Sequence, residues 1–211
     1  MVPKKKKILL YQGGRDYNLE KTFNHFKNIL TDYIVDCYND LDFLDKDDFY
    51  NYDTTIFYSW EGSLSQIQEE KLLKFISSGR GFIGLHGASA SFKNHPNYFK
   101  MLGGRFIKHG NISKFHIRIL DKEHEITHDQ NNFDFRDESY RHDFSMGKDI
   151  HILAEAEYND PDDLNPEPIM WVKNYGKGRV FFCALGHRTV ALKDPLFKNI
   201  IKRAVIWVLK V

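Results

Sequence analysis

The sequence predicts an α/β fold, a three-layer α/β/α sandwich with a mainly parallel sheet, antiparallel additions and a β-hairpin near the C-terminus. Short apolar runs alternate with amphipathic helical stretches over residues 8–85, which is typical of parallel strands joined by covering helices. Two apolar runs around a glycine-containing turn near residue 177 indicate the hairpin. With 211 residues the chain is long enough for one well-buried core and short for two, so we expect a single domain over residues 1–211.

The first half of the chain is predicted to form four strands and two helices. Asn18 can cap the first helix, and Ser65-x-x-Gln68 is a capping-box pattern that begins the second, which Gly79 can end. The acidic segment from Asp40 to Asp48 lacks the turn glycine and terminal glutamate of a calcium loop, so it is expected to be solvated surface. The strands are expected at Ile8–Tyr11, Tyr33–Cys37, Thr54–Tyr58 and Gly81–Leu85. The apolar faces are expected to comprise Leu19, Phe23, Phe26 and Leu30 in the first helix and Leu64, Ile67, Leu72, Phe75 and Ile76 in the second.

The second half is predicted to be less regular. Alternating apolar residues over Phe115–Ile119 indicate an antiparallel or edge strand, and a second alternation covers Ile150–Tyr158. Neither His124–Thr127 nor Phe133–Tyr140 has a strong helical period. The proline and aspartate content of Asp160–Pro166 indicates a surface loop. The remaining expected elements are a short helix at Pro96–Leu102, a hairpin of Ile169–Val172 and Val180–Leu185 around Gly176-Lys177-Gly178, and a C-terminal helix that begins at Asp194-Pro195.

The charge balance argues against several classes of partner. Lysine and arginine number 30 against 29 for aspartate and glutamate, so no global field attracts nucleic acid or an anionic membrane. A basic lead-in at residues 1–7 precedes the apolar run Ile8–Tyr11, which is too short for a signal peptide or a membrane span. We therefore expect a cytoplasmic protein that binds a small molecule and has no nucleic-acid or membrane partner. Whether the protein forms a homo-oligomer stays open.

Five residues are candidates for a functional site. His86 ends the fourth predicted strand, and His187 follows the second strand of the hairpin. Because the carboxyl ends of parallel strands meet at one rim of a sheet, we expect both imidazoles at the same rim. His109, Asp137 and Glu138 can join them from the less regular middle region.

These residue types fit two kinds of chemistry. Imidazoles and carboxylates together support general acid–base catalysis near neutral pH, or a small nitrogen and oxygen metal site, for which zinc is the first candidate. No His-Glu-x-x-His or comparable motif is present, so metal binding stays open. A structural interpretation also exists, since a histidine after a strand can cap a loop and Asp137 and Glu138 can anchor backbone amides. The other histidines, Trp171 and both cysteines are expected to be packing or surface residues, while Trp60 could line the mouth of a pocket.

Four segments carry a family signature when they are taken in order. They are Gly84-Leu-His86, Leu102-Gly-Gly-Arg-Phe-Ile-Lys-His109, Asp137-Glu-Ser-Tyr140, and a hairpin containing Pro168-Ile-Met-Trp171, Tyr175-Gly-Lys-Gly-Arg-Val-Phe181 and Ala184-Leu-Gly-His187. In this order they resemble the ThuA-like (trehalose utilisation) family. The resemblance implies a flavodoxin-like sheet of the class I glutamine amidotransferase type.

The resemblance does not imply glutaminase activity. Amidotransferases present a nucleophilic cysteine at the turn that His86 occupies here, and an imidazole cannot replace a thiolate as the acyl acceptor. Family members often carry a histidine where this chain has Arg15-Asp16, proline at the position of Glu125 and leucine at that of Ser139. The histidine that is missing near Arg15 removes one candidate site group, so activities found elsewhere in the family need not transfer whole.

Two functions remain open from the sequence. The resemblance implies an enzyme of carbohydrate catabolism, acting on trehalose or a keto-sugar by hydrolysis, elimination or isomerisation, with His86 and His187 exchanging protons and Glu138 orienting one of them or binding a metal. The alternative is a non-catalytic sugar-binding or regulatory module on the same scaffold, and fold alone does not decide. An enzyme is expected to bring at least two of the candidate groups within about 3–4 Å of each other.

Overall fold

The computed structural model describes residues 4–14, 18–158 and 166–210, and these residues contain a mixed nine-stranded sheet in the order β2-β1-β3-β4-β9-β8-β7-β5-β6. Neighbouring strands from β2 to β9 are parallel, and those from β9 to β6 are antiparallel. The strands are β1 (Lys7–Tyr11), β2 (Ile34–Tyr38), β3 (Thr54–Tyr58), β4 (Gly81–Leu85), β5 (Arg105–Ile119), β6 (Phe133–Asp143), β7 (His151–Glu157), β8 (Glu167–Tyr175) and β9 (Gly178–Cys183). The helices are α1 (Leu19–Ile29), α2 (Gln66–Ser77), α3 (Pro96–Leu102) and α4 (Pro195–Val208).

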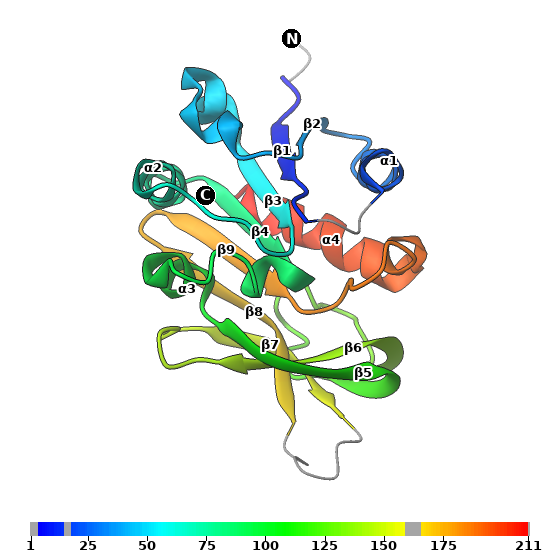
Figure 1. Ribbon diagram of the computed structural model, residues 1–211. Helices are drawn as coiled ribbons and strands as arrows, with labels where there is room; N and C mark the ends of the chain where they lie inside the picture. The colour runs from blue at the N-terminus through cyan, green and yellow to red at the C-terminus, as the bar shows by residue number, and fades with distance from the viewer. Residues whose placement is uncertain (1–3, 15–17, 159–165, 211) are drawn as a thin grey trace.

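The parallel half of the sheet is covered on both faces. Helices α2 and α3 lie on one side, and α1 and α4 lie on the other (Figure 1). Every residue of β3 and β4 is buried, as expected for central parallel strands that have helices above and below. The predicted α/β sandwich with a parallel core, antiparallel additions and the β8–β9 hairpin is confirmed.

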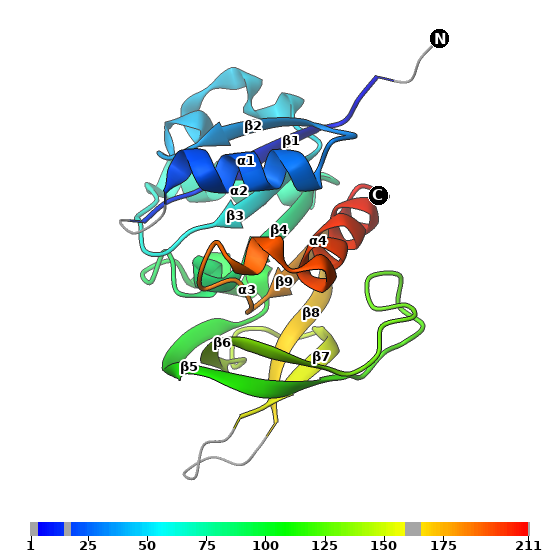
Figure 2. The ribbon, with the colours of Figure 1, turned by 90° about the vertical axis from the view of Figure 1, so that its right-hand side faces the viewer.

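The antiparallel strands β5, β6 and β7 form the end of the molecule opposite β1 and β2 (Figure 2). Here the prediction was incomplete. Strand β5 runs continuously over 15 residues, whereas the sequence pattern indicated a strand only at Phe115–Ile119. Strand β6, with 11 residues, was not predicted at all. Most of its side chains are charged or polar, so its strand conformation depends on pairing with β5 and not on intrinsic propensity.

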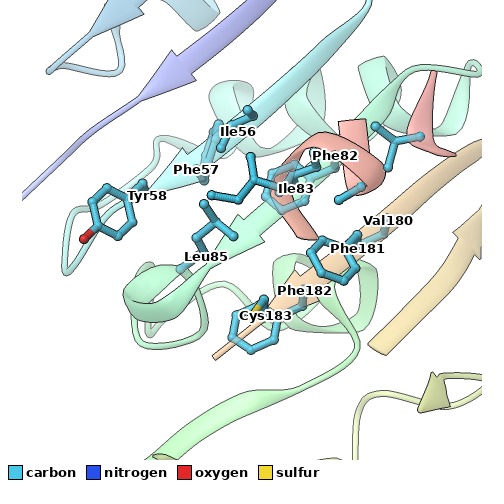
Figure 3. Close-up of a cluster of buried hydrophobic side chains, with 14 of the residues drawn as sticks. Ile56, Phe57, Tyr58, Phe82, Ile83, Leu85, Val180, Phe181, Phe182 and Cys183 are labelled. Atoms are coloured by element: carbon cyan, nitrogen blue, oxygen red, sulfur yellow. The ribbon is translucent and has the colours of Figure 1, made fainter. Parts of the chain in front are cut away.

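The apolar core lies between the central strands and the helices. Side chains of β3, β4 and β9 pack together across three neighbouring strands, with Ile56, Ile83 and Phe181 fully buried (Figure 3). At the edge of this core the Tyr58 hydroxyl donates a hydrogen bond to the carbonyl oxygen of Gly186 at 2.5 Å. The end of β3 is thereby joined to the turn that follows β9.

The helix starts follow their capping signals. Asn18 accepts a hydrogen bond from the Lys21 amide, and Ser65 and Gln68 form a complete capping box. Two predicted core residues are instead exposed at the first turns, Leu19 by 37% and Ile67 by 62%. The buried side chains of α1 begin at Thr22, and those of α2 begin at Glu69.

Other expectations concern the acidic segment, the basic lead-in and the surface loop. The acidic segment has its aspartates exposed, with two short 3-10 helices at Asp42–Asp45 and Asp47–Asn51. Lys7 of the basic lead-in belongs to β1. Most of the predicted loop Asp160–Pro166 and the Arg15-Asp16 departure lie outside the described residues. Among the described residues, no helix is long and apolar enough to cross a membrane.

Candidate functional site

Four of the five candidate residues meet around one carboxylate. His187 Nδ1 lies 3.1 Å and His86 Nε2 3.4 Å from Glu138 Oε2, while His109 Nδ1 lies 3.0 Å from the other oxygen, Oε1. The two imidazole nitrogens of His86 and His187 are 3.2 Å apart. The structure thus brings together groups that are as many as 101 positions apart in the sequence.

The parallel pairing of β4 with β9 explains why the two histidines meet. Leu85 pairs with Cys183, so both strands end at the same rim, as the sequence predicted. His86 follows immediately with a φ of 45°, which is unusual for a residue with a side chain. Gly186 has a φ of 113° and lets the chain turn before His187.

Asp137, the fifth candidate, faces the backbone and is absent from the pocket lining. Its carboxylate accepts hydrogen bonds from the Gly186 amide at 2.6 Å and the His187 amide at 3.2 Å. It also accepts one from the Glu138 amide at 2.9 Å. Asp137 therefore holds the turn that carries His187 against the strand that carries Glu138, which matches the anchoring interpretation of this residue.

The Glu138 carboxyl is strongly biased toward its ionised form. Burial opposes ionisation, but hydrogen bonds with His187 and His86 outweigh it and lower the pKa of Glu138 to about 2. The same contact with Glu138 raises the pKa of His187. A negative carboxylate between imidazoles is the electrostatic centre of the site.

The tautomer of His86 follows from a single contact. Its Nδ1 lies 2.7 Å from the carbonyl oxygen of Ala184, and a carbonyl oxygen can only accept, so Nδ1 carries the proton. Nε2 faces Glu138 and His187, so it donates to the carboxylate when the ring is charged and offers a lone pair when the ring is neutral. His86, Glu138 and His187 are the group of described residues whose donor atoms are arranged to hold a metal ion.

The cluster lies in a pocket of about 610 Å³. Aromatic side chains form part of its wall, including Trp60, which is 38% exposed, as the sequence suggested for this residue. Three cationic side chains line the pocket and come from different parts of the chain: Lys21, Lys93 and Arg188. The lining residues are Asn18, Lys21, Trp60, His86, Lys93, Phe106, His109, Glu138, Tyr140, His187, Arg188 and Thr189.

A buried polar network beside the pocket was missed by the sequence prediction, which placed His142 among packing or surface residues. His142 Nε2 lies 3.2 Å from Ser89 Oγ, and its Nδ1 lies 3.1 Å from Glu167 Oε1. Ser89 also donates to the carbonyl oxygen of His86 at 3.3 Å. The network therefore supports the turn behind His86. Glu138, Tyr140 and His142 alternate along the sequence and would share one face of a strand. Because no strand was predicted here, this alternation did not indicate that they lie together.

Neither cysteine is placed for nucleophilic chemistry. Cys183 is fully buried in β9, and burial raises the pKa of its thiol to about 12. Cys37 in β2 has a pKa raised to about 11 by burial. Neither lines the pocket, and the position after β4 belongs to His86.

The fold and the site together define a class: an α/β protein whose mixed sheet has a parallel core and antiparallel additions, with a histidine at the turn after β4. The family model described as trehalose utilisation, ThuA, matches residues 7–208. The chain belongs to the ThuA family. No curated protein matches it in sequence.

Solved structures agree on the fold. A ThuA-like protein from Parabacteroides merdae superposes with a TM-score of 0.85 at 20% identity, covering 98% of this chain and 91% of that one. A cytoplasmic protein from Salmonella typhimurium gives a TM-score of 0.68 at 11% identity, covering 95% of this chain and 99% of its own. A β-galactosidase from Bacillus circulans sp. alkalophilus gives 0.67 at 12% identity, over 96% of this chain and 31% of the larger protein. At these identities the likeness concerns the fold alone.

Proposed function

We propose that this protein is an enzyme that converts a small sugar derivative by acid–base chemistry. The observation that carries the proposal is the convergence of three imidazoles on the Glu138 carboxylate, with nitrogen to oxygen distances of 3.0–3.4 Å. Groups with perturbed pKa values in a concave pocket are typical of catalytic sites. The reaction classes that such groups serve without a nucleophile are hydrolysis, elimination and isomerisation beside a carbonyl.

His109 is the group best placed to exchange a proton with a substrate. Its side chain is 52% exposed, whereas those of His86 and Glu138 are 2% and 10% exposed. Its contact with Glu138 Oε1 at 3.0 Å orients the ring at the pocket wall. Within this proposal, Glu138 stays ionised and His109 alternates between proton donor and acceptor at the pocket wall.

Three features support a sugar as the substrate. The family is described by trehalose utilisation. The pocket volume of about 610 Å³ lies in the range of small-ligand sites. Trp60 and Phe106 in its lining offer apolar faces for the C–H surface of a sugar ring, while the histidines and Glu138 supply hydrogen-bonding groups. We also propose a cytoplasmic location, in line with the description of the Salmonella relative.

The test is turnover of a panel that contains trehalose, glucose and their keto derivatives, followed by proton NMR. We expect one class to be consumed, and His109→Ala and Glu138→Gln to lower the rate by at least about 100-fold, the usual contribution of a general acid or base. His116→Ala is the matched control, because His116 is an exposed histidine paired with Asp134 away from the pocket. Binding without turnover, unaffected by these variants, would instead support a sugar-binding module.

A further inference from the structure

We propose that His86 Nε2, His187 Nδ1 and Glu138 Oε2 are the ligands of a divalent transition metal ion, with zinc as the best match. The three atoms form a nearly regular triangle with sides of 3.2 Å between the imidazoles, 3.1 Å from His187 to Glu138 and 3.4 Å from His86 to Glu138. The site lies in the pocket to which we assign catalysis. The role of a metal ion in the reaction therefore rests on the proposed function, whereas metal binding itself can be tested separately.

The size of the triangle fits a tetrahedral ion. Metal to ligand bonds of about 2.0–2.1 Å, as zinc makes with histidine and carboxylate, separate the ligands of a tetrahedron by about 3.3–3.4 Å. The observed sides fall within about 0.3 Å of that value. Two histidines and one glutamate are also a ligand set that catalytic zinc sites use, with the fourth position left for water or substrate.

The side chains are prepared for metal binding by their other contacts. His86 donates its Nδ1 proton to the Ala184 carbonyl oxygen at 2.7 Å, which fixes the ring and leaves Nε2 as a lone-pair donor. Metal-binding histidines usually make such a hydrogen bond with their second nitrogen. Glu138 uses Oε2 toward the triangle and Oε1 toward His109, so the carboxylate is held from both sides.

The triangle is also accessible to a ligand from the pocket. All three residues line it, and His187 has a side chain that is 35% exposed. An ion held here would act as a Lewis acid toward a sugar carbonyl or hydroxyl oxygen. His109, beside the glutamate but outside the triangle, would remain free for proton transfer.

The experiment measures metal binding without any substrate. The purified, tag-free protein is treated with EDTA, dialysed, and titrated with Zn²⁺ against a chromophoric chelator, and Co²⁺ is added separately to record its visible spectrum. We expect one Zn²⁺ per chain and an intense tetrahedral Co²⁺ spectrum. His86→Ala, His187→Asn and Glu138→Gln should each weaken zinc binding by more than about 100-fold, since outer-shell changes alone cost about 10–100-fold.

The control is His151→Ala. It removes an exposed histidine that lies outside the pocket lining and whose Nε2 is 2.7 Å from Asp121 Oδ2. Its zinc affinity should equal that of the wild type. Circular dichroism identifies any variant that fails to fold, and Glu138→Gln, which keeps the side-chain shape, serves as the decisive one. Absence of stoichiometric binding, or binding that survives all three substitutions, would overturn the metal site. A protein that binds zinc through this triangle but turns over no sugar would refute the proposed function alone.

Discussion

At the level of single residues, Asp137 and Glu138 are neighbours in sequence with different tasks. Glu138 directs its carboxylate at three imidazoles, whereas Asp137 accepts hydrogen bonds from the backbone amides of Gly186 and His187. An anionic acceptor for two amides at a sharp turn fixes the position of the residue that follows the turn. Asp137 is therefore a positioning residue for His187.

Replacement of Asp137 by asparagine should disturb the site more than it disturbs the fold. One acceptor oxygen becomes a donor that faces the buried amides, which should lower the free energy of unfolding by about 1–3 kcal/mol. Zinc affinity should fall by about 10–100-fold, as when other supporting partners of metal ligands are changed. Urea unfolding and chelator competition measure the two effects. Asp134→Asn, an exposed site on the same strand, should change neither by more than about 0.5 kcal/mol.

His142 should make the stability of the protein dependent on pH. Its burial lowers its pKa below the usual value of 6.5, so the unfolded chain binds a proton that the folded chain resists. This contribution to stability is complete above pH 6.5 and is lost as the pH falls below it. The free energies of unfolding of the wild type and His142→Phe can be measured with urea at pH 8, 7, 6 and 5. Plotted against pH, the two curves should converge as the pH falls. Parallel curves would show that the pKa of His142 is the same in the folded and the unfolded chain, which would contradict this prediction.

At the level of elements, the turn after β4 depends on Gly87. A Cβ atom at this position would lie 2.4 Å from the carbonyl oxygen of Ser59, a backbone atom that has little freedom to move. The turn therefore packs directly against the end of β3. This close approach fixes the backbone next to His86.

The variant Gly87→Ala should shift this turn and with it His86. We expect lower stability and zinc binding weakened by at least about 10-fold, since ligand orientation controls affinity. The matched comparison is Ser65→Ala, which removes the N-cap of α2 and should cost about 1 kcal/mol of stability with no change in zinc affinity. Equal zinc affinity in both variants would show that the turn does not position His86.

The elements that sequence patterns predicted are those whose local chemistry agrees with the fold. Strands β3 and β4 are continuous apolar runs, and α2 and α4 begin at capping residues, so their boundaries were predictable. Strand β6 carries mostly polar residues because one of its faces builds the site and its buried network. Its conformation is set by pairing with β5, which no local pattern reveals. The register shifts of β5 beside His109 were hidden for the same reason.

At the level of the whole molecule, the order of strands in the sheet creates the site. The rule that parallel strands end at one rim was the basis for predicting that His86 and His187 share a rim. In the structure the parallel pairing of β4 with β9 brings their imidazole nitrogens within 3.2 Å of each other. The other pocket residues arrive from the start of α1, from the segments after β3, β4 and β9, and from strands β5 and β6. Of these, His109, Glu138 and Trp60 were named from the sequence. The remaining lining residues depend on the packing of distant elements, so the sequence did not indicate them.

Cations at the pocket rim should favour a negatively charged sugar derivative. Lys21, Lys93 and Arg188 line the pocket, are exposed, and make no ion pair with any residue that the structure describes. Calorimetry should show gluconate or glucose 6-phosphate binding more tightly than glucose at low salt, with the difference shrinking as salt is added. Lys93→Ala should reduce the preference for the charged sugar by about two- to fivefold, which corresponds to the energy of an exposed ion pair. Lys202→Ala, at an exposed position of α4, should leave the preference unchanged. A preference that is equal in both variants would contradict the role of the rim.

We infer that His86, Glu138 and His187 converge on one bound ion in a pocket suited to a sugar derivative. The most direct measurement is the anomalous difference density of zinc-loaded crystals, recorded above the zinc absorption edge. We predict one peak per chain within about 2.0–2.2 Å of His86 Nε2, His187 Nδ1 and a Glu138 carboxylate oxygen. A peak elsewhere, with these three side chains hydrogen-bonded to one another, would contradict the assignment of these residues as metal ligands.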